Sequence, residues 1–339
     1  MAPSRVTLDA DNMPLAEVLA AIETQTGNRL SDHRVQFGQD AEAVRVTLKI
    51  DDAPFWFAVD QVLDATGLDV YSFAGDDALA LVGRDDGARS RHGPGYLSGP
   101  CRFEVSEVPA IRDLRSPDDH ALNVGLDVAW EPRLRPIALS QPLKDVAAIG
   151  DNGRPLTVKS QRPVLDVEVP AGNQATMFVL PLNLPSRNVK TITQINGKMT
   201  ALVPGRRVVF RFADLEAMTA ADAKSLTQSR GGVHVTLAAV RKSGAIWEVH
   251  MRLRLDDANA ALESHRGWVF QNVTYMIDGD GNEIEHAGFE TTRQTESEVG
   301  CAYLFDVPEE IANYTWVYET PAAIVEFPVE YELRDIPLP

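Results

Sequence analysis

Residues 6–27, VTLDADNMPLAEVLAAIETQTG, and residues 46–67, VTLKIDDAPFWFAVDQVLDATG, are two versions of one pattern set forty positions apart. Three groups of residues match at this offset: Val6-Thr7-Leu8 with Val46-Thr47-Leu48, Pro14 with Pro54, and Thr26-Gly27 with Thr66-Gly67. Each copy predicts a strand, a turn, a helix with proline in its first turn, and a glycine where the helix stops. Such repeats stack to bury a shared core. The pattern therefore predicts one small α/β module over residues 1–85.

Apolar spacing defines the faces of this module. Helical spacing predicts that two sets of side chains point inward: Leu15, Val18, Leu19 and Ile22 in the first helix, and Phe55, Val59, Val62 and Leu63 in the second. Strand alternation directs Val6, Leu8, Val46 and Leu48 into the same core, with both helices on one sheet. Residues 68–73 and 78–82 flank Gly75-Asp76-Asp77, which is typical of a hairpin. The expected element order is β-α-β-β-α-β-β.

The rest of the chain predicts mostly strands. Residues 86–99 are rich in glycine, proline and charge and are expected to form a linker that few contacts cross. Short alternating segments then fill residues 100–215 and 231–339, separated by a connector with helical character at 216–230. Turns every 8–12 residues favour β-sandwiches over a parallel sheet. The predicted fold class is α+β, a small N-terminal module followed by two all-β immunoglobulin-like sandwiches.

The two β blocks resemble each other, which predicts a duplication. The segment Phe210-Arg-Phe-Ala-Asp-Leu near the end of the first block parallels Tyr331-Glu-Leu-Arg-Asp-Ile near the end of the second. Earlier, Leu182-Asn-Leu-Pro parallels Phe305-Asp-Val-Pro. The alternative interpretation is that two unrelated sandwiches share the same turn residues.

Residues 5–85 resemble the secretin and TonB N-terminal short domain. The resemblance rests on Val6-Thr-Leu-Asp-Ala-Asp-Asn-Met-Pro-Leu, on Thr26-Gly27, and on Val46-Thr-Leu-Lys-Ile-Asp-Asp-Ala-Pro with Val62-Leu-Asp-Ala-Thr-Gly-Leu. The second unit departs from the family pattern because it has Phe55 and Trp56 where the family usually has leucine and a polar residue. The resemblance implies a domain that binds partner proteins in the bacterial envelope and has no catalytic residues. It covers about a quarter of the chain, and neither secretin channel strands nor a receptor barrel is expected after it.

Composition narrows the classes of partner. The chain has 339 residues and a formal net charge of −17, which disfavours nucleic acid and anionic lipid as partners. The apolar runs are too short for a membrane helix, so no direct membrane insertion is expected. Met1 is followed almost directly by a strand pattern, so we expect no signal peptide in this sequence. The protein is then either cytosolic or a mature exported segment, and the family resemblance favours the periplasm or cell envelope.

No cluster of reactive residue types in the sequence predicts a catalytic, cofactor or metal site. Glu263-Ser-His265-Arg-Gly-Trp268 combines three reactive residue types, but neighbours along an extended chain point apart. Asp278-Gly-Asp-Gly-Asn-Glu resembles the start of a calcium loop, and a hairpin turn explains it better. Cys101 and Cys301 are expected to be buried free thiols, with an interdomain disulfide as the alternative.

The sequence therefore predicts a non-enzymatic envelope protein that acts through protein-interaction domains in series. The first alternative is a carbohydrate-binding surface protein that would use Trp247, Trp268 and Trp316, although core packing is the better explanation of each tryptophan. A glycosidase or peptidase is a third alternative, for which two facing carboxylates in a cleft would be needed.

Overall fold

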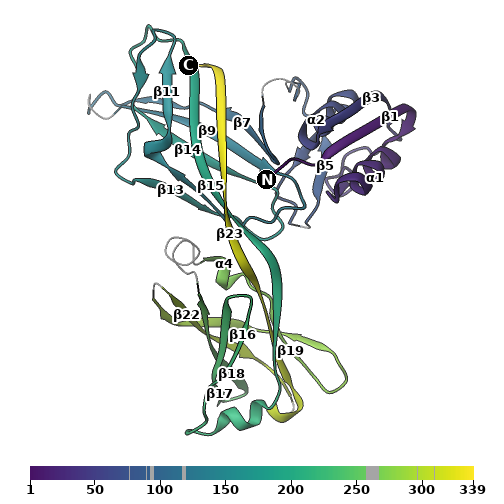
Figure 1. The fold of residues 1–339 in the computed structure, drawn as a ribbon, viewed down its shortest axis with the longest axis vertical. Helices are drawn as coiled ribbons and strands as arrows, with labels where there is room; N and C mark the ends of the chain where they lie inside the picture. Colours follow the sequence, from purple (N-terminus) through teal and green to yellow (C-terminus); the bar gives the residue numbers. More distant parts are fainter. Residues whose placement is uncertain are drawn as a thin grey trace. The chain divides into compact units, whose positions relative to one another are not determined.

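The computed structural model describes residues 1–75, 77–88, 90–91, 95–116, 120–256, 267–295, 297–308 and 310–339. The fold is mostly β, with its strands arranged in several sheets (Figure 1). Among the described residues, no helix is long and apolar enough to cross a membrane.

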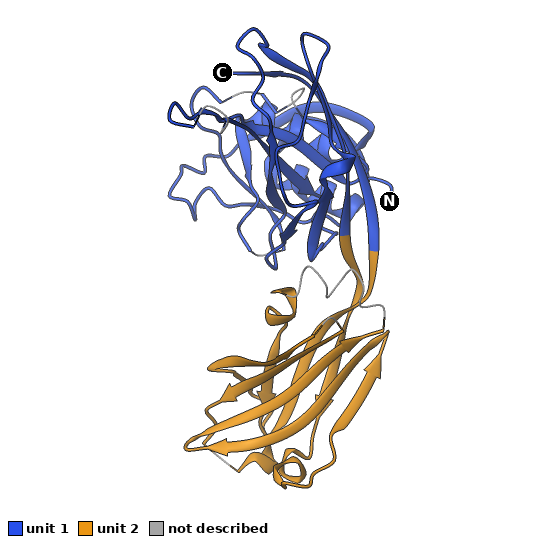
Figure 2. Ribbon diagram, turned by 90° about the vertical axis from the view of Figure 1, so that its left-hand side faces the viewer, with its two compact units in different colours: residues 1–201, 326–339 blue, residues 202–325 orange. Residues whose placement is uncertain are grey.

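The chain divides into two compact units (Figure 2). Unit 1 comprises Met1–Ala201 and Glu326–Pro339, and unit 2 comprises Leu202–Val325. The chain passes from unit 1 to unit 2 within strand β15 (Thr191–Phe212) and returns within strand β23 (Thr315–Pro337). These divisions differ from the boundaries that the sequence predicted, because the ends of two long strands belong to different units.

The N-terminal part of unit 1 has the predicted order of elements. They are β1 (Arg5–Pro14), α1 (Leu15–Thr26), β2 (Leu30–Asp32), β3 (Arg45–Pro54), α2 (Phe55–Thr66), β4 (Leu68–Tyr71) and β5 (Leu79–Gly83). Each helix ends at a glycine in the left-handed region, Gly27 with a φ of 69° and Gly67 with a φ of 67°, as the pattern predicted. Pro14 and Pro54 precede the helices as N-cap residues, one position earlier than expected.

The core of this module contains the predicted side chains. Leu15, Val18, Leu19 and Ile22 of α1 are buried in one cluster with Phe55, Val59, Val62 and Leu63 of α2. The prediction of one sheet was wrong, because β1 pairs only with β3 while β2, β5 and β4 form a second sheet. Alternation reveals which side of a strand is buried but not which strand is its neighbour. Leu48 was predicted to point into the core, but it is only half-buried against this cluster. Ile50, two residues further along β3, is 3% exposed.

The β part of unit 1 contains two groups of strands. One sheet has the order β14–β9–β7–β6, with β8 also paired to β9, and the other strands pair around the first part of β15. The strands are β6 (Tyr96–Ser98), β7 (Cys101–Glu107), β8 (Ala110–Arg112), β9 (His120–Trp130), β10 (Ala138–Pro142), β11 (Ala147–Gly150), β12 (Pro155–Leu156), β13 (Val164–Glu168) and β14 (Ala175–Leu182). A 3₁₀ turn (Leu143–Asp145) separates β10 from β11.

Unit 2 is built on a sheet with the order β16–β17–β18–β22–β21. Its elements are a 3₁₀ helix (Leu215–Thr219), β16 (Leu226–Arg230), β17 (Val233–Ser243), β18 (Ile246–Leu255), α4 (Gly267–Phe270), β19 (Thr274–Ile277), β20 (Glu283–Glu285), β21 (Gly288–Gln294), β22 (Glu298–Phe305) and a 3₁₀ turn (Ile311–Asn313). Trp268 and Val269 lie in the short helix α4, ahead of strand β19. Within this unit, Trp316 stacks on Phe212 at a ring-centroid distance of 5.3 Å.

The segments at the ends of the two long strands are alike in burial and in backbone conformation. Phe210, Phe212 and Leu215 are buried in unit 2, and Tyr331, Leu333 and Ile336 are buried in unit 1. Asp214 and Asp335 both have positive φ angles, 64° and 54°. The similarity seen in the sequence therefore extends to the backbone. The segment at the end of the first block belongs to unit 2, however, and the segment at the end of the second block belongs to unit 1.

Candidate functional site

A groove in unit 1 is the candidate functional site. Its volume is about 1180 Å³. One wall is the second part of β7 from Glu104 to Glu107, and another is the end of β23 from Glu332 to Pro337. Asp69 of β4 and Tyr96 of β6 also line it. All these residues belong to unit 1, so the groove lies within one compact body.

Two strand edges face this groove. Strand β7 pairs with β9 along its length, but β6 pairs only with its first part, Cys101–Phe103. Within the described ranges, no strand pairs with Glu104–Glu107 on the side away from β9. Likewise, the part of β23 after Glu332 has a described sheet neighbour only in β15, because β19 pairs with Thr315–Tyr318. Backbone donors and acceptors that lack a strand partner can pair with an added chain.

The charged residues that line the groove are mainly acidic. Its carboxylates belong to Asp69, Glu104, Glu107, Asp127, Glu332 and Asp335, and its cations are Arg91 and Arg334. Three carboxylates have arginine partners, since Asp69 pairs with Arg91, Glu104 with Arg102, and Glu332 with Arg334. For the remaining three, Glu107, Asp127 and Asp335, the described part of the chain supplies no ion-pair partner. The groove therefore presents an excess of negative charge.

Of the three carboxylates without an arginine partner, Asp127 is half-buried, and Glu107 and Asp335 are exposed. Loss of solvation on burial raises the pKa of Asp127, and the nearby charges of Glu104 and Glu107 raise it further. A hydrogen bond of 3.2 Å from the Ser106 hydroxyl opposes this shift. A cation bound next to Asp127 would stabilise its ionised form, so the site favours positively charged ligand groups over neutral ones.

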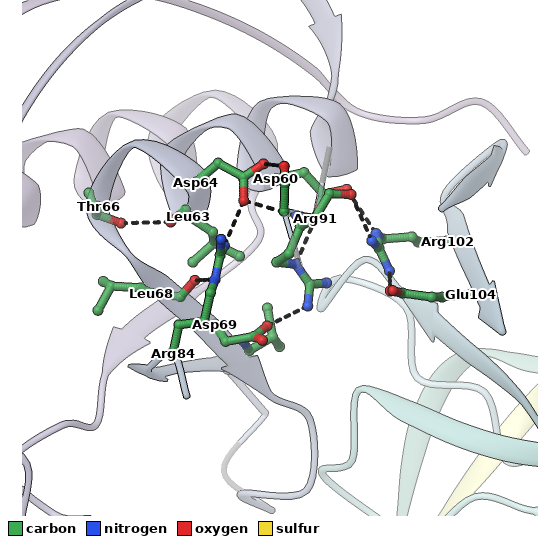
Figure 3. A network of polar contacts seen from close by, with 12 residues as sticks. Asp60, Leu63, Asp64, Thr66, Leu68, Asp69, Arg84, Arg91, Arg102 and Glu104 are labelled. Atoms are coloured by element: carbon green, nitrogen blue, oxygen red, sulfur yellow. Dashed lines mark hydrogen bonds and ion pairs between the residues drawn. The ribbon is translucent and has the colours of Figure 1, made fainter. Parts of the chain in front are cut away.

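Figure 3 shows a network of ion pairs and hydrogen bonds around Asp60. Two of its members, Asp69 and Glu104, line the groove. Asp60 of α2 accepts hydrogen bonds from Nε of Arg91 at 2.9 Å and from Nε of Arg102 at 2.8 Å. The side chains of Asp60 and Arg102 are 6% and 4% exposed. Arg91 and Arg102 also hold Asp69 and Glu104, the two carboxylates at the groove. The network thus connects helix α2 of the N-terminal module to strand β7.

A second buried contact joins the same parts of unit 1. The carboxylate of Glu131 is fully buried and accepts hydrogen bonds from the Ser4 hydroxyl at 2.6 Å, Nδ2 of Asn28 at 3.1 Å and Nε of Arg133 at 2.6 Å. The indole N–H of Trp56 donates to the carbonyl of Pro100 at 3.1 Å. The sequence predicted few contacts across the linker, and this was wrong. The polar partners lie far apart in the chain, so their spacing gave no signal.

The residues that the sequence singled out do not form a common site. Trp247, Trp268 and Trp316 are all buried, which removes the motivation for a sugar-binding face built on them. Glu263, Ser264 and His265 lie outside the described residues. Cys101 and Cys301 are buried free thiols, as predicted, and burial raises the pKa of each, to about 12 and about 11.

The acidic segment at 278–283 is a turn, as predicted. Oδ1 of Asp278 accepts hydrogen bonds from the backbone N–H groups of Asp280 at 3.0 Å and Asn282 at 2.8 Å. Hydrogen bonds from the side chain and backbone of Asn282 lower the pKa of Asp278. Its carboxylate therefore closes the turn.

The structure also reveals a Ser–His–Asp cluster in unit 2 that the sequence did not indicate. The hydroxyl of Ser229 lies 2.7 Å from Nδ1 of His234, and Nε2 of His234 lies 2.6 Å from Oδ1 of Asp256. Ser229 and His234 are direct partners across the hairpin formed by β16 and β17. Ser229 and Asp256 are exposed, whereas nucleophilic catalysis relies on sites that are shielded from water. We therefore interpret the cluster as a set of cross-strand polar contacts on an exposed face of the sheet.

Comparison with protein-family models, curated proteins and solved structures finds no match.

Proposed function

We propose that this chain is a non-enzymatic bacterial envelope protein that acts by protein–protein interaction, and that the groove of unit 1 binds an extended, basic segment of a partner. The observation that carries the proposal is the edge of β7 at Glu104–Glu107, which faces an acidic groove without a described strand on that side. The resemblance of residues 5–85 to envelope domains supports the proposed location. The β part of unit 1 and unit 2 would each be a sandwich of the immunoglobulin type, a common scaffold for interaction surfaces.

An extended ligand fits the two walls of the groove. A peptide that adds a strand to β7 gains main-chain hydrogen bonds, and its alternate side chains point to opposite faces of the sheet. The groove offers both apolar and acidic neighbours to such side chains, among them Val105, Leu333 and Glu107. A segment that alternates apolar and basic residues would match this lining.

Charge supplies the specificity. Glu107 and Asp335 are exposed at the groove, and Asp127 is half-buried there. A lysine or arginine of the partner placed beside these carboxylates would be attracted to them, whereas an acidic peptide would be repelled. Complementary charge also speeds association. Because these charges lie close to water, salt should weaken the binding.

The proposal is tested by fluorescence anisotropy with two defined probes, a short peptide alternating lysine and valine and its counterpart alternating glutamate and valine. The full chain should bind the lysine peptide, and binding should weaken on adding salt and in a Glu107→Gln variant. Glu290→Gln, an exposed glutamate on strand β21 of unit 2, is the matched control and should bind like the parent. Equal binding of both peptides, or no effect of Glu107→Gln, would contradict the proposal.

A further inference from the structure

Three exposed aromatic side chains of the N-terminal module contact one another outside the groove. Phe37 lies in the turn after β2, Tyr71 ends β4, and Phe73 lies in the turn that follows. The ring of Tyr71 contacts that of Phe37 at a centroid distance of 4.8 Å and that of Phe73 at 6.0 Å. We call these three residues the aromatic cluster. Phe37, Tyr71 and Phe73 are 48%, 37% and 53% exposed.

The packing of the module does not account for the aromatic cluster. None of its three side chains belongs to the hydrophobic core formed by the two helices and their strands. Single exposed apolar residues are ordinary, but exposed aromatic rings in mutual contact mark interaction surfaces. Aromatic side chains are also the most frequent anchors of such surfaces. The cluster is therefore a candidate binding surface.

The size of the aromatic cluster limits the kind of partner. An aromatic side chain that becomes fully covered buries about 150–250 Å², so three half-exposed rings offer on the order of 300 Å². A folded partner or a second copy of the chain would cover about 800 Å² on each side of a stable interface. The cluster therefore fits a short segment of a partner better than a folded surface.

The backbone of β4 disfavours a segment that binds as an added strand. At one end of β4, the carbonyl of Leu68 accepts a hydrogen bond from Nε of Arg84 at 3.0 Å. Just after the other end, the carbonyl of Ser72 accepts the backbone N–H of Gln174 at 2.8 Å. Both acceptors are thus already engaged. A polyproline II segment needs no such ladder, because it binds aromatic-lined sites through its side chains.

The aromatic cluster supplies the contacts that a polyproline II segment uses. The ring of Tyr71 stands at 63° to Phe37 and at 77° to Phe73, so the rings form an angled apolar surface against which proline rings can pack. No residue in the described ranges hydrogen-bonds the Tyr71 hydroxyl. This hydroxyl can therefore donate to a carbonyl of the bound segment, whose backbone groups have no internal partners.

The charges near the aromatic cluster are mainly negative. Arg34, which precedes Phe37, is buried and paired with Asp32. Asp40 and Glu42, which follow Phe37, are exposed. Residues 68–77, which carry the other two rings, include acidic residues and neither lysine nor arginine. A segment with basic residues beside its prolines complements this charge, and its cations are also attracted to aromatic ring faces.

We propose that the aromatic cluster binds a proline-rich segment of a partner protein in the polyproline II conformation, with arginine or lysine beside the prolines. The cluster and the groove share no residue, so this inference does not depend on strand addition at β7.

The test measures fluorescence anisotropy of labelled peptides with the full chain. The first peptide consists of repeated Ala-Pro-Pro units with arginine at both ends. In one matched peptide alanine replaces every proline, and in the other glutamate replaces both arginines. The full chain should bind the first peptide at least several-fold more tightly than either matched peptide. An excess of the peptide alternating lysine and valine should not displace it, because that peptide is expected in the groove.

Three variants locate the binding on the chain. Phe73→Ala should weaken binding of the first peptide by about tenfold, as truncation of an aromatic anchor does. Tyr71→Phe removes only the hydroxyl and should weaken binding several-fold without changing the melting temperature. Ile111→Ala is the matched control, because Ile111 is 55% exposed on β8 of the same unit, and it should bind like the parent.

Four results would overturn the proposal. The first is binding of the alanine peptide as tight as that of the proline peptide, which would show that the polyproline II conformation is not recognised. The second is an effect of Ile111→Ala as large as that of Phe73→Ala. The third is displacement by the lysine–valine peptide, which would place the proline peptide in the groove. The fourth is a dimer of the parent chain in light scattering that Phe73→Ala dissociates, because a second copy would then cover the cluster.

Discussion

Asn12 and Asp52 occupy equivalent positions in β1 and β3, and each donates its backbone N–H to the threonine hydroxyl of the other strand. The N–H of Asn12 lies 2.9 Å from Oγ1 of Thr47, and the N–H of Asp52 lies 3.1 Å from Oγ1 of Thr7. Both residues have positive φ angles, 49° and 40°. The repeat seen in the sequence is thus a repeat in space, in which each copy supports the irregular backbone of the other.

The positive φ of Asn12 leads to a first prediction. Asn12→Ala should lower the free energy of unfolding by about 1–2 kcal/mol, because alanine is disfavoured in the left-handed region. Asn12→Gly should be close to the parent, since glycine adopts this conformation readily. Urea unfolding of both variants measures the difference. Equal stability of the alanine and glycine variants would show that the backbone here carries no such strain.

The core of the N-terminal module leads to a second prediction. Leu19 is 7% exposed and packs in the cluster formed by both helices and strands β1 and β3. Leu19→Ala should therefore cost about 2–5 kcal/mol of stability. Glu17→Ala, at an exposed position of the same helix, should change stability by no more than about 0.5 kcal/mol. Thermal melting compares the two, and similar melting temperatures would remove the proposed core.

A third prediction concerns Asp60 and the attachment of the module to strand β7. Asp60→Ala would leave Arg91 and Arg102 without their shared carboxylate in a buried setting, so we expect a loss of about 3–5 kcal/mol. Asp9→Ala removes an exposed partner of Lys49 and should have little effect. The measurement is chemical unfolding, followed by limited proteolysis between residues 85 and 100. A variant as stable and as resistant as the parent would contradict the role of this network.

Whether residues 1–85 can fold alone depends on the contacts that join them to the rest of unit 1. A fragment that ended at residue 85 would leave Asp60 without Arg91 and Arg102, and Trp56 without the Pro100 carbonyl. Expression of this fragment and a circular dichroism spectrum would decide the question.

The sequence predicted those parts of the structure that depend on local patterns. The helices ended at Gly27 and Gly67 as expected, because an αL position after a helix has a strong local preference for glycine. The likeness of the segments around Asp214 and Asp335 was visible as a repeat, but the passage of β15 and β23 from one unit into the other was not. A strand has the same alternation whichever sheet it joins, so the pattern could not place β15 or β23.

The groove could not be predicted for a similar reason. Its walls come from residues near 70, 105, 127 and 335. Each of these short segments contains at most two of the acidic residues of the groove, and they form no recognisable motif. Only pairing between distant strands brings Glu104, Asp127 and Asp335 to one place.

The raised pKa of Asp127 leads to a fourth prediction. A carboxyl whose pKa is higher in the folded state stabilises the fold when protonated, and this contribution is lost as the pH rises through the folded pKa. Asp127→Asn should therefore be more stable than the parent at pH 7, and the difference should shrink below about pH 4, near the ordinary pKa of aspartate. Urea midpoints at both pH values test this, with Asp166→Asn as a control for the loss of a surface charge. A variant less stable than the parent at pH 7 would contradict the assignment.

The central claim is that the edge of β7 in the acidic groove accepts an extended basic peptide. Hydrogen exchange of the backbone amides, with and without the peptide alternating lysine and valine, tests it most directly. We predict slower exchange over Glu104–Glu107 when the lysine peptide is present, no change with the glutamate peptide, and no change over the exposed edge strand β21 of unit 2. Unchanged exchange over Glu104–Glu107 at peptide concentrations that saturate binding would contradict the account.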